Sequence, residues 1–266
     1  MPQVTVNGIQ LYYERGGAGP GAPTLLFISG SGGDLRNRPN QFDSPLAQHF
    51  DLVCYDQRGL GRTENPDGVF TMAQYADDAA GLMDALAIDR ALVMGVSFGG
   101  MVAQEFALRH SARISRLALA CTSSGGAGGA SYPLHELVEL PAEERAVAHL
   151  KVADLRHTQS WIAAHPEQWA KRVAQSVASQ PRAEVAEGAA KQLAARWGHN
   201  TYERLPALTM PVLLAGGEFD GIAPKENMTA MHAQLPHSEL RFYIGGHMFL
   251  IQDKSAYPEI VAWLLA

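Results

Sequence analysis

Hydrophobic positions along this chain form short apolar runs separated by longer amphipathic stretches. The runs are short enough for strands, and several have no polar interruption, which is typical of strands buried on both faces. They cover 4–6, 9–13, 25–28, 52–55, 91–96, 114–121, 211–215 and 240–244. The first two flank Asn7-Gly8, a dipeptide that strongly favours a tight β-hairpin.

Amphipathic stretches between these runs predict helices. Thr71 can cap a helix over 72–86, in which apolar residues recur at helical spacing. Further helices are predicted over 98–110 and 256–265. Strands that alternate with helices indicate an α/β protein with a mostly parallel central sheet flanked by helices. The opening hairpin adds antiparallel edge strands.

The pattern changes after Thr122. A flexible Gly/Ser-rich stretch follows, and from Pro141 to about Asn200 the chain reads as wholly helical. Breaks in this helical part are predicted at His165-Pro166 and Gln180-Pro181. The strand-like runs then resume.

This change divides the chain into two parts. We predict an α/β core formed by 1–122 and 207–266, and a helical cap formed by 123–206. Ligands of such sheets bind outside the carboxyl ends of the strands, so the site is expected between core and cap. The cap would exclude water and shape the substrate pocket.

Composition narrows the function classes. The chain has 266 residues, 47% of them hydrophobic and 18% charged, so it can bury a sizeable core without disulfides or metals. Its net charge of −6 argues against a nucleic-acid partner, which would require a basic face. A small-molecule substrate is the expected partner. The sequence leaves the oligomeric state open, a dimer included.

Location is also suggested by the sequence. There is no run of 18 apolar residues and no basic segment followed by an apolar one at the N-terminus. We therefore expect no membrane association and a cytoplasmic protein. Cys54 and Cys121 lie in apolar runs and are interpreted as buried free thiols, with a single bridge as the alternative.

A candidate nucleophile lies in Gly95-Val96-Ser97-Phe98-Gly99. This G-x-S-x-G sequence follows a predicted strand and opens a predicted helix, which is the setting that the motif requires. The glycines permit a strained turn that pushes Ser97 out at the end of the strand. An ordinary glycine-rich turn with an idle serine is the alternative.

A serine nucleophile needs a base and an acid that orients the base. His247 is the candidate base because it follows a late strand and Gly245-Gly246. Asp220 is the candidate acid because it lies just beyond the preceding strand, and Glu218 is its local competitor. The chain order of serine, acid and histidine fits the G-x-S-x-G setting.

An oxyanion hole requires two backbone N–H donors. Phe98, the residue after the candidate nucleophile, supplies one. Ser31 is our choice for the second, with Gly30 as the alternative, because the glycine-rich loop at 29–33 follows an early strand. Such a loop could also cradle phosphate, but the sequence lacks the lysine and glycine spacing of nucleotide-binding motifs.

Together these segments resemble the α/β-hydrolase superfamily over nearly the whole chain. The segments are FISGSGG, YDQRGLGRT, GVSFGGMVAQEFA, LAGGEFDGIAP and GGHMFL. Within it, the chain looks most like the small esterase branch that includes 3-oxoadipate enol-lactonases. The loop at 29–33 departs from many members, which carry His-Gly where this chain has Ser29-Gly30.

The resemblance implies an α/β-hydrolase fold and a Ser97–His247–Asp220 catalytic triad that needs no cofactor and no metal. The expected activity is hydrolysis of a small or medium carboxylic ester or lactone through an acyl-enzyme. The alternatives are a C–C bond hydrolase or a perhydrolase with the same triad and, outside enzymes, a ligand receptor with slow turnover.

Other residues are interpreted structurally. Asp56 and Arg58 are expected to form an ion pair or hold loop backbone, and His199 is expected to pack where the insert returns to the core. Arg36 and Arg38 are interpreted as solvated, with a substrate carboxylate as their alternative partner. Three tryptophans are interpreted as core of the insert: Trp161, Trp169 and Trp197. The alternative is that one of them lines the substrate pocket.

Overall fold

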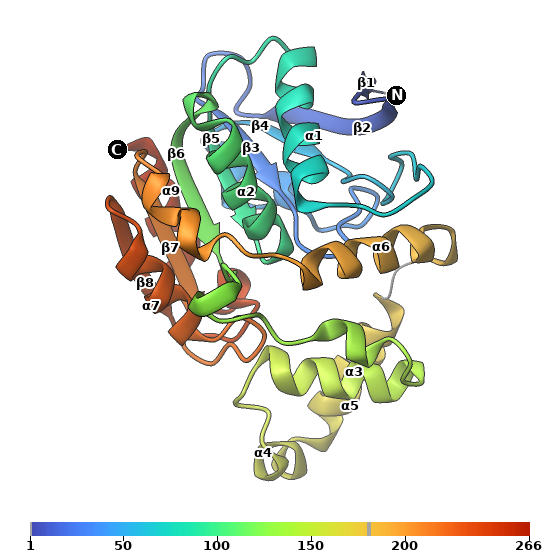
Figure 1. Ribbon diagram of the computed structural model, residues 1–266. Helices are drawn as coiled ribbons and strands as arrows, with labels where there is room; N and C mark the ends of the chain where they lie inside the picture. The colour runs from blue at the N-terminus through green and yellow to red at the C-terminus, as the bar shows by residue number, and fades with distance from the viewer. Residues whose placement is uncertain (1, 180–181) are drawn as a thin grey trace.

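The computed structural model describes residues 2–179 and 182–266, which contain one eight-stranded, mostly parallel sheet (Figure 1). The strand order is β1-β2-β4-β3-β5-β6-β7-β8. β1 and β2 pair antiparallel, as do β2 and β4, and the remaining neighbours are parallel. The strands are β1 (Gln3–Val6), β2 (Ile9–Gly17), β3 (Thr24–Ile28), β4 (Asp51–Tyr55), β5 (Ala91–Val96), β6 (Ile114–Ala120), β7 (Val212–Gly217) and β8 (Ser238–Tyr243). The predicted α/β class and antiparallel opening hairpin are confirmed.

Alternate side chains along the central strands point to opposite faces of the sheet, and both faces are buried. Leu26 and Ile28 of β3 belong to the apolar cluster that includes α1, α2 and α7, whereas Leu25 and Phe27 belong to the cluster that includes α9. The flanking helices are α1 (Met72–Ala85), α2 (Phe98–Arg109), α7 (Lys225–Gln234), α8 (Phe249–Gln252) and α9 (Ala256–Leu265). Helices on both faces explain why the central strands have no polar face.

The flanking helices differ in how well the sequence predicts them. The expected helix N-cap is present at the start of α1, where the Thr71 hydroxyl accepts a hydrogen bond from Gln74 N–H. α7 was not predicted from the sequence. That helix follows Pro224, has no side-chain N-cap, and buries only Met228 and Met231 among its apolar residues longer than alanine. Its pattern is therefore too polar to signal an amphipathic helix.

The insert between β6 and β7 contains four α-helices in the described residues. They are α3 (Ala142–Ala153), α4 (Gln159–Ala164), α5 (Pro166–Ala178) and α6 (Ala186–Trp197). Figure 1 shows α6 lying between the part of the molecule that contains the sheet and the group α3–α5. The break at His165-Pro166 is confirmed, an unpredicted one falls at 154–158, and Gln180-Pro181 lies outside the described residues. The cap boundaries, 123 and 206, stay a prediction.

Candidate active site

Ser97 occupies the turn between β5 and α2 in a strained backbone conformation. Its φ of 55° and ψ of −118° lie where residues with side chains are rarely found. A Cβ atom at Gly95 would overlap the carbonyl oxygen of Gly99, and one at Gly99 would overlap the carbonyl oxygen of Ile28. The two glycines of the motif therefore let neighbouring backbone close around Ser97 and hold its hydroxyl at the end of β5.

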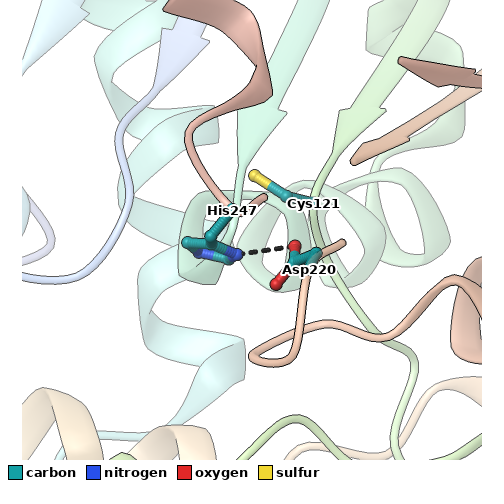
Figure 2. A group of neighbouring side chains, drawn as sticks. All are labelled: Cys121, Asp220 and His247. Atoms are coloured by element: carbon teal, nitrogen blue, oxygen red, sulfur yellow. Dashed lines mark hydrogen bonds and ion pairs between the residues drawn. The ribbon is translucent and has the colours of Figure 1, made fainter. Parts of the chain in front are cut away.

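His247 joins Ser97 to Asp220 through hydrogen bonds. His247 Nε2 lies 2.9 Å from Ser97 Oγ, and Nδ1 lies 2.8 Å from Asp220 Oδ2 (Figure 2). The Asp220 side chain is fully buried, and its Oδ1 accepts hydrogen bonds from the N–H groups of Ile222 at 2.8 Å and Ala223 at 3.0 Å. Both carboxylate oxygens therefore have hydrogen-bond partners, and the backbone bonds to Oδ1 orient the carboxylate so that Oδ2 faces His247.

The competing acid lies elsewhere. Glu218 is exposed, and its carboxylate pairs with Lys225 at 3.3 Å. The structure thus brings Asp220, and not Glu218, to His247.

The loop that carries His247 is supported from the insert. The N–H of His247 donates to the carbonyl of Ala153 at 2.6 Å, at the end of α3. Gln252 accepts from Gly246 N–H at 2.7 Å and donates to Asp154 Oδ2 at 3.1 Å. Asp154 and Gln252 were not predicted from the sequence, because their mutual contact joins residues 98 positions apart and neither residue lies in a motif.

Cys121 lies beside this group of side chains, as Figure 2 shows. Its sulfur and the donor atoms of Asp220 and His247 lie within 4.8 Å of one another. Burial raises the pKa of the Cys121 thiol well above its ordinary value, so it is a protonated, poor metal ligand. Asp220 Oδ2 and His247 Nδ1 are hydrogen-bonded to each other, and Asp220 Oδ1 accepts from two backbone N–H groups. This donor set fits a hydrogen-bonded chain better than a metal site. Both cysteines are buried free thiols, as predicted.

The loop at 29–33 approaches Ser97 from the end of β3. A Cβ atom placed on Gly30 would lie 3.5 Å from the Cβ of Ser97. The loop makes a tight turn, in which Gly33 N–H donates to the carbonyl of Gly30 at 3.2 Å. Gln57 Nε2 donates to the carbonyl of Ser29 at 2.7 Å and fixes the start of the loop.

Several backbone N–H groups in this region, that of Gly30 among them, have no acceptor in the described part of the chain. They include those of Ser31 and Phe98, the pair predicted as oxyanion donors. The neighbouring Gly32 N–H is engaged, because it donates to Gln192 Oε1 at 2.9 Å. The geometry therefore leaves the predicted pair of donors available near Ser97.

The loop after β4 has a structural role. Asp56 Oδ1 accepts from Leu35 N–H and Oδ2 from Arg62 N–H, so this buried carboxylate holds loop backbone as expected. The ion-pair alternative for Asp56 and Arg58 is wrong, because Arg58 pairs with Asp78 at 2.8 Å.

Arg36 and Arg38 have acidic partners. Arg36 contacts Asp34 at 2.7 Å and Glu184 at 2.6 Å, and Arg38 contacts Asp43 at 3.1 Å. Only 19% of the Arg36 side chain is exposed, so the interpretation of Arg36 as a solvated surface residue is wrong. Its guanidinium is held between the loop and the insert.

A cavity of about 450 Å³ lies between the loop at 29–33 and the insert. This size suits a small or medium ligand. Its lining is mainly apolar and comes from the loop and from the insert: Ser31, Gly32, Leu134, Leu137, Val138, Arg145, Ala146, His149, Ser176, Ser179, Ala186, Ala189, Ala190, Gln192 and Leu193. Burial lowers the pKa of His149, so its imidazole is neutral at pH 7. Ser31 is the one predicted site residue that lines this cavity.

The three tryptophans of the insert lie outside this cavity lining. Trp161 and Trp169 are partly buried and pack on the ring of His157, with centroids 5.1 and 5.3 Å apart. The prediction that Trp197 belongs to the insert core is wrong, because 68% of it is exposed. Ala195 and Arg196 occupy the buried side of the last turn of α6, which leaves Trp197 to the solvent.

His199 is buried where the insert returns to the core, as expected. Burial lowers its pKa to about 4, against the opposing effect of a hydrogen bond with the Ser123 backbone. The imidazole therefore stays neutral in the folded protein under conditions in which an unfolded chain would protonate it. The protein accordingly loses stability as the pH falls from 6.5 towards 4.

Replacement of His199 by Gln should reduce this acid sensitivity. The full effect of such a pKa difference is about 3 kcal/mol in the free energy of unfolding. Urea unfolding at about pH 7 and pH 4.5 should show a pH-dependent loss that is about 2–3 kcal/mol smaller in the variant than in wild type. Asn200→Ala, a neighbouring change that removes no titratable group, should keep the wild-type loss. An equal loss in His199→Gln and wild type would contradict this account.

Comparison with known proteins agrees with this fold. The family model described as alpha/beta hydrolase fold matches residues 23–254. The chain belongs to the α/β-hydrolase fold family. The resemblance stated from the sequence motifs is therefore confirmed at the level of the family. In this α/β hydrolase, the sheet order, the strained serine turn and the helical insert after β6 occur together.

Relatives of this α/β hydrolase are named for diverse activities. A putative carbamate hydrolase RutD from Agrobacterium fabrum is 31% identical over 227 residues, covering 82% of this chain and 83% of that protein. The 2-hydroxymuconate semialdehyde hydrolase of Pseudomonas sp. strain CF600 is 27% identical over 285 residues, covering 99% and 93%. The crystal structure of the enol-lactonase from Burkholderia xenovorans LB400 matches with a TM-score of 0.81 and 26% identity, covering 99% of both chains.

The helices also bear on the membrane prediction. Among the described residues, no helix combines the length and apolar character needed to cross a bilayer.

Proposed function

We propose that this protein is a serine hydrolase that cleaves carboxylic ester or lactone bonds. The observation that carries the proposal is the continuous chain of hydrogen bonds from Ser97 through His247 to the buried Asp220. A serine hydroxyl is a weak nucleophile at neutral pH, and this arrangement supplies both the base and the group that orients it.

The proposed reaction has two halves. His247 Nε2 takes the proton from Ser97 as its oxygen attacks the carbonyl carbon, and the N–H groups of Ser31 and Phe98 stabilise the oxyanion. His247 then gives that proton to the departing alcohol, which leaves an acyl-enzyme. A water molecule, deprotonated by His247, attacks the acyl group; His247 then gives that proton to Ser97 Oγ as the acid is released. Asp220 fixes the imidazole tautomer and stabilises its cation throughout.

The cavity between loop and insert supports a small or medium substrate with apolar parts. Its volume is about 450 Å³, and its lining includes Ser31, one of the two proposed oxyanion donors. We assign it to the apolar portion of the substrate. The likeness to an enol-lactonase of 26% identity supports ester or lactone chemistry over other acyl transfers.

Cleavage of a C–C bond is the second candidate. It is favoured by the relative named 2-hydroxymuconate semialdehyde hydrolase, which matches 99% of this chain. The same serine, base and acid would serve that reaction, so the two candidates differ in substrate rather than in machinery.

A substrate panel tests the proposed function. It consists of p-nitrophenyl esters from acetate to decanoate, simple lactones, and a vinylogous 1,5-diketone as a C–C substrate, with Ser97→Ala protein as the blank. Release of p-nitrophenol or lactone opening well above the blank supports the ester or lactone proposal. Turnover of the diketone alone would replace it with the second candidate. No turnover of any substrate by folded protein would overturn both.

Ala189→Phe should shift the acyl-chain preference of this enzyme towards shorter esters. Ala189 lines the cavity from α6, and a benzyl group there would take up space needed by a longer chain. One methylene in an apolar pocket is worth about 10- to 200-fold in discrimination, so kcat/KM for octanoate should fall at least about tenfold while acetate changes little. Ala194→Phe, at an exposed position of the same helix, is the control. An unchanged chain-length profile in Ala189→Phe would remove this cavity as the acyl site.

A further inference from the structure

Gln192 connects the insert to the loop that approaches Ser97. It lies on α6, its side chain is fully buried, and its Oε1 accepts a hydrogen bond from Gly32 N–H at 2.9 Å. The two residues are 160 positions apart in the chain. The accepted N–H belongs to the residue directly after Ser31, whose own N–H has no acceptor in the described residues.

Packing does not explain an amide at this position. The other end of the side chain, Nε2, is buried and has no hydrogen-bond partner in the described part of the structure. A buried donor without a partner is unfavourable, and an apolar side chain of the same length would avoid it. The useful atom of Gln192 is therefore Oε1, and its only described contact of this kind is with the loop.

α6 is held firmly enough to act as a support. A Cβ atom on Gly188 would overlap the carbonyl of Gly59, so helix and core backbone are in direct contact there. Lys191 Nζ, next to Gln192, donates to the carbonyl of Pro66 at 2.9 Å. These contacts set the position of α6 on the core, and Figure 1 shows the helix running alongside it.

We propose that Gln192 is a positioning residue that holds the loop at 29–33 in the geometry needed to stabilise the oxyanion. This inference rests on the proposed function. Gln192 touches no reacting atom in this account. By fixing the Gly32 N–H, it restrains the peptide beside Ser31 and so holds the proposed oxyanion donor in place. The same residues line the cavity assigned to the substrate, so the insert contributes to catalysis as well as to shape.

The test compares Gln192→Met with wild-type enzyme on the best ester of the panel. Methionine keeps the length and removes the oxygen acceptor. Misplacement of catalytic groups by about 1 Å costs about 100-fold, so kcat should fall about 10- to 100-fold. KM should stay within about threefold, because the ground-state substrate does not need the oxyanion donors. Gln175→Met is the matched control, since Gln175 is an exposed glutamine of the insert. It should retain wild-type kcat.

Two further readouts separate positioning from general damage. The affinity for an alkyl boronic acid, which mimics the tetrahedral oxyanion, should fall by about the same factor as kcat. Gln192→Glu keeps an oxygen acceptor at the same reach, so its kcat should exceed that of Gln192→Met several-fold. Full recovery is not expected, because a carboxylate would add negative charge near the oxyanion. Thermal unfolding checks that each variant is folded, and Gln192→Leu replaces Gln192→Met if the latter is not.

The outcomes distinguish this inference from the function on which it rests. If wild type hydrolyses the ester and the folded Gln192→Met protein matches its kcat and boronate affinity, the positioning role is wrong. A kcat for Gln192→Glu that is no higher than that of Gln192→Met would also contradict the positioning role. If wild type shows neither ester turnover nor boronate binding, the proposed function itself fails.

Discussion

Ser97→Ala protein should lose essentially all ester hydrolysis, with kcat reduced about 10⁵- to 10⁶-fold. The Ser97 hydroxyl, which His247 contacts at 2.9 Å, is the nucleophile that carries the acyl group in the proposed mechanism. Removing it leaves the oxyanion donors and the cavity in place, so substrate should still bind with little change in affinity. Initial rates with a p-nitrophenyl ester, measured at high enzyme concentration, give the residual kcat.

Ser31→Ala is the matched control, because it removes another serine hydroxyl from the same site. Ser31 is assigned a role through its backbone N–H, which alanine retains, so kcat should stay within about fivefold of wild type. Near-complete activity in Ser97→Ala, or a loss in Ser31→Ala as large as in Ser97→Ala, would contradict the assignment of roles.

Asp220→Asn should lower kcat about 10⁴-fold while the fold is preserved. The N–H groups of Ile222 and Ala223 both point at one carboxylate oxygen. In the variant, the amide oxygen must take that place, which turns the NH₂ group towards His247 Nδ1. The imidazole then has to accept at Nδ1 and carry its proton on Nε2, where it cannot accept the proton of Ser97.

Glu218→Gln is the matched control for the acid. Glu218 lies two residues earlier, is exposed, and pairs with Lys225. Its loss should change kcat less than about twofold, because an exposed ion pair is worth little. Rates at saturating ester, with thermal unfolding as the check on folding, decide the matter. A large loss in Glu218→Gln together with a small one in Asp220→Asn would assign the acid to Glu218.

Much of the architecture could be predicted because its signals are local. Buried parallel strands appear as apolar runs, the Asn7-Gly8 turn marks the hairpin, and Thr71 marks the start of α1. The residues around Ser97 could be predicted for the same reason, since a strained turn between strand and helix needs glycines at fixed spacing. The expected order of serine, acid and histidine along the chain then limits which acid and which histidine can belong to the site.

Other features could not be predicted because they depend on contacts between distant segments. Nothing near Gln192 indicates that its oxygen meets Gly32 N–H, and nothing near Asp154 indicates its bond with Gln252. The exposure of Trp197 has a related cause. Large aromatic residues are usually buried, but the last turn of α6 has its buried side already filled.

Covalent labelling tests the central claim most directly. An alkyl fluorophosphonate reacts with a serine that is activated by a neighbouring base, and the mass of the intact protein and of its peptides locates the product. We expect one phosphonyl group per chain on Ser97 in wild type, much slower labelling in Asp220→Asn, and none in Ser97→Ala. A folded wild-type protein that remains unlabelled, or one labelled at another residue, would contradict the assignment of Ser97 as the nucleophile.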